Sequence, residues 1–82
     1  MSLSGTRADR KERTRESLMR AGRTLFAQRP VESVSIDELV VAAKVAKGSF
    51  YNHFEDRDAL ARSVAGEIRT LLNDRALLLN AD

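Results

Sequence analysis

Apolar and polar positions repeat with helical spacing through most of this chain, most clearly in the stretch 35–54, SIDELVVAAKVAKGSFYNHF. The apolar residues of its first half fall at i, i+3, i+4 and i+7: Ile36, Leu39, Val40 and Ala43. Ser35 followed by Glu38 has the spacing of a capping box, which marks a helix start. The apolar stripe stops at Lys44, so we predict a helix about two and a half turns long.

A second short helix is predicted from about Ala46 or Lys47 to Phe54. At the helical repeat, three residues stack on one side: Ala46, Phe50 and Phe54. The other residues form what we call the polar face: Lys47, Gly48, Ser49, Tyr51, Asn52 and His53. Their side chains are of the kinds that bond phosphate oxygens or base edges, and Gly48 would let a large partner approach the backbone. A solvated outward face is the ordinary alternative.

Longer helices are predicted on either side of this unit. The first begins between Thr6 and Thr14 and ends near Arg29, because Pro30 cannot continue it. Its inward residues are predicted to be Leu18, Ala21, Leu25 and Phe26. A connector at 31–34 follows, and Val31 or Val34 can act as a hydrophobic staple on the next helix.

The last helix is expected to be capped by Asp56, with Asp58 in its first turn, and to persist to Leu79. Its apolar stripe comprises Leu60, Val64, Ile68, Leu71 and Leu72. A leucine-rich end of this kind indicates a partner surface. One alternative function is therefore a helical protein-interaction module that uses this end.

These elements predict an all-α fold in which a three-helix domain with a helix-turn-helix is extended by a long fourth helix. We divide the chain into a disordered basic leader at 1–9, a helix-turn-helix domain at 10–56 and the fourth helix at 57–82. The helix-turn-helix unit itself spans 35–54.

Charge is distributed unevenly. Residues 1–29 hold eight Arg and Lys against three Asp and Glu, a net charge of +5, whereas residues 30–82 hold six against nine, a net charge of −3. The excess lies in the leader and the first helix, mainly at five residues: Arg7, Arg10, Lys11, Arg13 and Arg15. Such an excess suggests a polyanionic partner on that side, although a solvated basic helix is the alternative.

Composition argues against several other classes. The sequence has no Cys and one His, so it predicts no disulfide, no zinc site and no metal or cofactor. It contains neither an apolar stretch of about 18 residues nor a signal-peptide core, which favours a cytoplasmic location. A membrane-binding first helix is disfavoured, because the core needs its apolar residues.

Catalysis is not expected. Ser49 and His53 are four residues apart on a helix and Asp56 is near, but a short exposed helix offers no oxyanion hole. No glycine-rich phosphate loop occurs, and Gly22 is expected to allow close helix packing. We predict that the chain is not an enzyme.

The run K-G-S-F-Y-N-H-F followed by E-D-R-D-A-L resembles the signature of the tetracycline-repressor (TetR) family of bacterial transcription regulators. L-F at 25–26 and S-I-D-E-L at 35–39 also match in order and spacing, so the resemblance covers about 15–72. Three positions depart from the family pattern. Lys44 stands at the turn where Gly is usual, Ala46 replaces a Ser or Thr cap, and Pro30 stands where a Gly commonly ends the first helix.

The resemblance implies sequence-specific binding of double-stranded DNA, with the second helix of the unit in the major groove. Face geometry and resemblance together assign phosphate contacts to Lys47, Tyr51, His53 and Arg57. The same reasoning assigns base edges to Ser49, Asn52 and Lys44. Gly48 would permit close approach, and Ser35 would offer its hydroxyl or helix-end amides to a phosphate.

Family members carry a further helical domain that binds a small-molecule effector and dimerises. By this resemblance, the parent protein is expected to be a homodimeric, ligand-released repressor in the bacterial cytoplasm. The present chain is then expected to be a fragment that lacks the effector domain.

Overall fold

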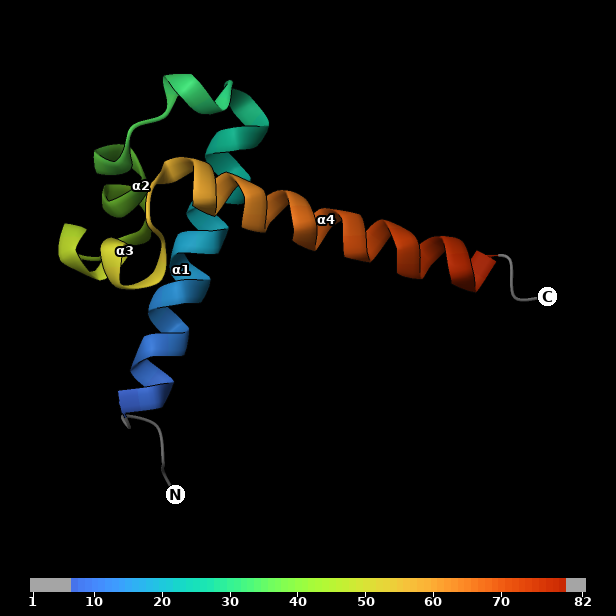
Figure 1. Ribbon diagram of the computed structural model, residues 1–82, viewed down its shortest axis with the longest axis horizontal. Coiled ribbons are helices and arrows are strands. Elements are labelled where there is room, and N and C mark those ends of the chain that lie inside the picture. Colours follow the sequence, from blue (N-terminus) through green and yellow to red (C-terminus); the bar gives the residue numbers. More distant parts are fainter. Residues whose placement is uncertain (1–6, 80–82) are drawn as a thin grey trace.

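Four α-helices and one 3-10 turn make up the computed structural model, which describes residues 7–79, with side chains through residue 73. The elements are α1 (Arg7–Gln28), η1 (Val31–Ser33), α2 (Ile36–Ala43), α3 (Lys47–His53) and α4 (Arg57–Leu79). The described residues contain no strand, so the predicted all-α class and its four helices are confirmed (Figure 1).

The first helix starts between Thr6 and Thr14, as predicted, but inside the leader of the domain division. α1 begins at Arg7, so the last three residues of the predicted disordered leader are helical, and that part of the prediction was wrong. Residues 1–6 of the leader lie outside the described residues. The other end of α1 is as predicted, because the helix stops at Gln28, just before Pro30. The Pro30 carbonyl then accepts a hydrogen bond from the Ser33 amide at 3.0 Å, which starts η1.

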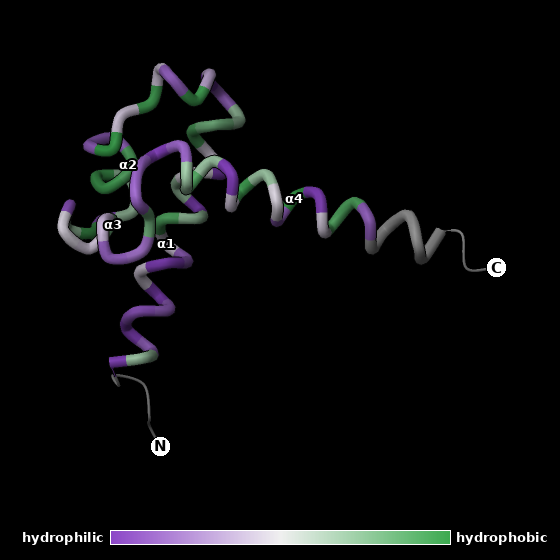
Figure 2. The backbone as a smooth tube through the Cα atoms, in the orientation of Figure 1, coloured by the Kyte–Doolittle hydropathy of each residue, from purple (hydrophilic) through white to green (hydrophobic). Residues whose placement is uncertain are grey.

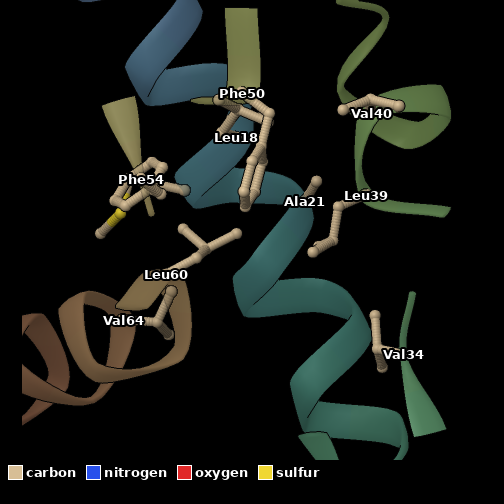
Figure 3. Packing of buried hydrophobic residues seen from close by; sticks show 10 residues of the cluster. Leu18, Ala21, Val34, Leu39, Val40, Phe50, Phe54, Leu60 and Val64 are labelled. Carbon is tan, nitrogen blue, oxygen red and sulfur yellow. The ribbon is translucent and has the colours of Figure 1, made fainter. Parts of the chain in front are cut away.

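One apolar core joins all four helices (Figure 3). Its buried members are Leu18, Met19, Ala21, Val34, Leu39, Val40, Phe50, Phe54, Leu60 and Val64. Leu25 and Phe26, which we predicted to face inward, are only partly buried and pack against its edge. Met19 is buried although the predicted stripe did not include it.

Tertiary packing holds the short third helix in place. α3 is only seven residues long, and isolated helices of that length are not stable in water. Phe50 is fully buried, and its ring lies 5.8 Å from that of Phe54. Burying a Phe side chain contributes roughly 1.5–3 kcal/mol. The two phenylalanines therefore fix which residues of α3 face outward.

The start of α2 is fixed by local bonds that the sequence predicted. The Glu38 amide donates to Ser35 Oγ at 3.1 Å, and the Ser35 amide donates to Glu38 Oε1 at 2.9 Å, which completes the capping box. Val34, just before the cap, is buried in the same core as Leu39, as a hydrophobic staple requires. Arg29 pairs with Glu38 at 2.6 Å and ties the end of α1 to this cap.

α4 crosses α1 and then runs away from the other helices (Figure 1). Its start is capped by Asp56, whose Oδ1 accepts the Ala59 amide at 2.8 Å. Where α1 and α4 cross, Arg23 bonds Glu67. Beyond the crossing, three large apolar side chains are exposed: Ile68, Leu71 and Leu72. No helix in the described part of the chain is long and apolar enough to cross a membrane.

Candidate nucleic-acid interface

The turn between α2 and α3 uses a left-handed residue. Lys44 caps the end of α2 with φ 60° and ψ 44°. Among the described residues, Lys44 alone has a positive φ without being glycine. The Val45 amide donates a hydrogen bond to the Val40 carbonyl at 3.1 Å, which is typical of helices that end in this conformation. The family pattern usually has Gly at this turn, and a side chain makes the left-handed conformation more costly.

α3 begins without a side-chain cap, as the sequence implied, because Ala46 stands at the cap position with extended backbone angles. The residues at the centre of the polar face are exposed, whereas Ser49 and His53 at its edge are partly covered. Nothing lies within 4 Å of the position a Cβ at Gly48 would occupy. This part of the face is therefore open to a large partner.

A cleft runs between the first half of α1 and α3, and we call it the α1 cleft. It measures about 540 Å³. Its lining residues are Arg7, Arg10, Lys11, Thr14, Ser49, Asn52 and His53. These include three cations and no carboxylate. The hydrophilic half of α1 that forms one wall is visible in Figure 2.

A second cleft, the α2 cleft, lies on the opposite edge of α3 and measures about 440 Å³. Its lining residues are Ser35, Ile36, Asp37, Lys47, Tyr51, Asp56, Arg57 and Asp58. Three carboxylates accompany two cations here. The two clefts thus differ in charge, although both border the polar face.

Both cations of the α2 cleft already have partners. Lys47 Nζ lies 2.9 Å from Asp37 Oδ1 across the gap between α3 and α2. The Arg57 Nη1 group donates to the Glu32 and Val34 carbonyls at 3.2 and 3.1 Å. Arg57 therefore ties the start of α4 to the segment before α2. Its Nε lies 3.6 Å from Asp58 Oδ1, so Nη2 is the donor it could offer a phosphate.

His53 sits beside cations. Its pKa is lowered below 6.5, first by partial burial and then by the positive charges of Lys11 and Arg15, with Glu12 acting in the opposite direction. The imidazole is therefore mainly neutral at pH 7. The Arg15 guanidinium lies over the Phe54 ring, 5.7 Å from its centre, and joins α1 to the end of α3.

The structure thus distributes the site residues predicted from sequence over two clefts. Ser49, Asn52 and His53 line the α1 cleft, and four others line the α2 cleft: Ser35, Lys47, Tyr51 and Arg57. Gly48 and Lys44 line neither cleft, and Lys44 lies in a separate groove with Arg20 and Thr24.

Four cleft residues on α1 were absent from the predicted site: Arg7, Arg10, Lys11 and Thr14. A signal for them existed, since they fall at i, i+3, i+4 and i+7 and so share one helix face. Their charge alone indicates a basic leader, whereas the structure makes them one wall of a cleft. In the described part of the chain, no three acidic or His side chains gather as a metal site would need.

A known protein family matches this chain. The family model for bacterial regulatory proteins of the tetR family matches residues 18–64, which is more than half of the chain. The matched region contains the turn at Lys44 and all of α3. A comparison with solved structures found no match. The chain belongs to the tetR family of bacterial regulatory proteins.

Proposed function

We propose that this DNA-binding regulatory domain recognises specific duplex sequences by placing the polar face of α3 in the major groove. The observation that carries the proposal is that a cleft flanks each edge of that exposed face. A major groove about 12 Å wide admits a helix, and a phosphate backbone then runs along each side of it. The two clefts stand where those two backbones would pass.

The α1 cleft suits one backbone electrostatically. Arg7 and Lys11 offer positive charge without a carboxylate among the lining residues, and His53 can donate one ring N–H. We therefore propose that the basic face of α1 contacts the same phosphate backbone as His53. Ser49 and Asn52 line the same cleft from α3, and we assign them to base edges.

The α2 cleft suits the other backbone through its neutral donors. Ser35 and Tyr51 carry hydroxyl groups, and Lys47 adds an ammonium once Asp37 releases it. Arg57 would contribute through Nη2, because Nη1 bonds two backbone carbonyls and Nε faces Asp58. Lys44 lies in neither cleft, so its contact with a base edge stays a prediction.

A library experiment tests this division of labour. The chain is equilibrated with randomised duplexes, and bound sequences are counted for the parent, Tyr51→Ala and Asn52→Ala. Phosphate contacts carry no sequence information, so Tyr51→Ala should weaken binding to all sequences similarly. Asn52→Ala should instead change which sequences are preferred. Equal losses at both positions across the library would contradict the assignment.

Finer regulatory features rest on the family resemblance alone. We propose that the parent protein is a homodimeric repressor in the bacterial cytoplasm, bound to the nucleoid when active. We propose that a small-molecule effector, held by a further helical domain, releases it from DNA.

A second candidate function is supported by the exposed apolar side chains of α4, since Ile68, Leu71 and Leu72 remain 46%, 59% and 61% exposed. They would let the chain act as a helical protein-interaction module. Replacement of Lys47 and Tyr51 separates the two functions, because it should abolish DNA binding and leave a partner of α4 unaffected.

A further inference from the structure

We propose that Asp37 competes with DNA phosphate for Lys47 and so sets the strength of DNA binding without changing which sequence is read. This inference rests on the proposed function. Asp37 was not among the residues that the sequence assigned to the site. The structure places its carboxylate 2.9 Å from the ammonium of Lys47, at the edge of the polar face.

The geometry favours competition over a purely structural role. The two side chains come from different helices, and both remain largely exposed, at 54% for Lys47 and 73% for Asp37. Exposed ion pairs contribute little to stability, so a phosphate can displace the carboxylate. Asp37 does not cap α2 either, because Ser35 and Glu38 complete the capping box.

The negative charge of the α2 cleft makes the entry of a phosphate less favourable. With Asp37, Asp56 and Asp58 against Lys47 and Arg57, the lining residues carry a net charge of −1. A phosphate that enters must separate Lys47 from Asp37 and then lie close to the freed carboxylate. The α1 cleft, which has no carboxylate in its lining, imposes no such exchange.

Removal of the Asp37 charge should therefore tighten DNA binding. Asp37→Asn keeps the size of the side chain and leaves Lys47 available to phosphate. We expect affinity for every duplex to rise about two- to fivefold, the range set by exposed ion pairs. The slope of log K against log salt should become more negative by up to about 0.9, the value for one added phosphate contact.

The test is a double-mutant cycle read by fluorescence anisotropy on one labelled duplex. Asp37→Asn is measured in the parent and in a Lys47→Met background, each over a series of salt concentrations. Glu32→Gln is the matched control, because it removes an equal charge from an exposed side chain that lies outside both clefts. Circular dichroism establishes that each variant is folded.

Tighter binding of Asp37→Asn in the parent, beyond that of Glu32→Gln and absent from the Lys47→Met background, supports the proposal. An equal gain in both backgrounds would overturn it, because the effect would then be long-range charge. Weaker or unchanged binding would also overturn it, whereas the proposed function would stand as long as the parent binds DNA. A folded parent that binds no duplex at low salt would refute both.

Discussion

Gly22 of α1 lies directly against Val64 of α4, so that a Cβ built on Gly22 would lie 3.2 Å from Val64 Cγ2. The same Cβ would lie 3.3 Å from two atoms of Leu60. Both α4 residues are buried in the core that also holds Phe50 (Figure 3). The missing side chain thus allows α4 to pack closely on the helix that forms one wall of the α1 cleft.

A larger side chain at this crossing should destabilise the fold. We expect Gly22→Val to lower the free energy of unfolding by about 1–3 kcal/mol, because added atoms in a packed core force neighbours to move. Gly66→Ala is the control, since that glycine of α4 faces open space and should gain up to about 1 kcal/mol in helix propensity. Urea unfolding of both variants measures the difference. A Gly22→Val variant as stable as the parent would show that the close contact is unimportant.

The left-handed turn at Lys44 predicts a stabilising substitution. A side chain at φ 60° meets the following carbonyl, at a cost of roughly 1–2 kcal/mol that glycine avoids. Glycine also adds freedom to the unfolded chain, so Lys44→Gly should raise the free energy of unfolding by about 0.5–1 kcal/mol. Thermal unfolding compares it with Lys44→Ala, which keeps the strain and should gain nothing. The expectation fails if the alanine variant gains as much as the glycine variant.

Glu38 should make part of the stability depend on pH. Its pKa is lowered from 4.5 to about 2, first by the bond from Arg29 and then by the Ser35 amide. A carboxyl group with a lower pKa in the folded state stabilises above its unfolded value, so this contribution is present above pH 4.5 and lost as pH falls toward 2. Melting temperatures between these pH values should fall less steeply for Glu38→Gln. Glu55→Gln, at an exposed residue outside both clefts, should keep the slope of the parent.

His53 should couple DNA binding to pH. Its pKa is lowered by partial burial and by Lys11 and Arg15, and a phosphate in the α1 cleft would offset those positive charges. The complex then takes up a proton, so affinity should rise as pH falls from about 8 through 6.5, the ordinary pKa of a histidine. Anisotropy titrations across this range, at constant ionic strength, should show a flatter profile for His53→Gln. Parallel profiles for parent and variant would place the phosphate away from His53.

His53 makes the stability of the free chain depend on pH in the opposite direction to DNA affinity. A folded-state pKa below 6.5 means that the unfolded chain binds the proton more readily. The contribution of His53 to stability is therefore complete above pH 6.5 and declines as pH falls below that value. Acid would weaken the fold while it strengthens DNA binding, which keeps the two effects distinguishable.

Local rules explain which features the sequence predicted. The capping box at Ser35, the cap at Asp56 and the stop before Pro30 depend on residues within one turn of each other. The stripe that buries Leu60 and Val64 follows from helical periodicity alone. The role of Gly22 could be predicted because few other reasons place a glycine among core residues of a helix.

Features that depend on how helices cross could not be predicted from the sequence. The pairing of Lys47 with Asp37 requires the angle between α2 and α3, and no spacing rule gives it. Face geometry and the family resemblance assign Arg57 to phosphate, but neither shows that its Nη1 donates to two backbone carbonyls. Ser49 and His53 are partly covered because α1 passes beside them, a consequence of packing between distant parts of the chain.

The central claim is that the polar face of α3 is the DNA-binding surface. Its most direct test is a fluorescence-anisotropy titration with mixed-sequence duplex at low and moderate salt, comparing the parent with Lys47→Ala/Tyr51→Ala. Arg62→Ala, a charge loss at an exposed position on α4, is the control. We predict that the parent binds, that its affinity falls steeply with salt, and that the double variant loses binding while the control keeps it. Equal binding by the parent and the double variant would contradict the claim.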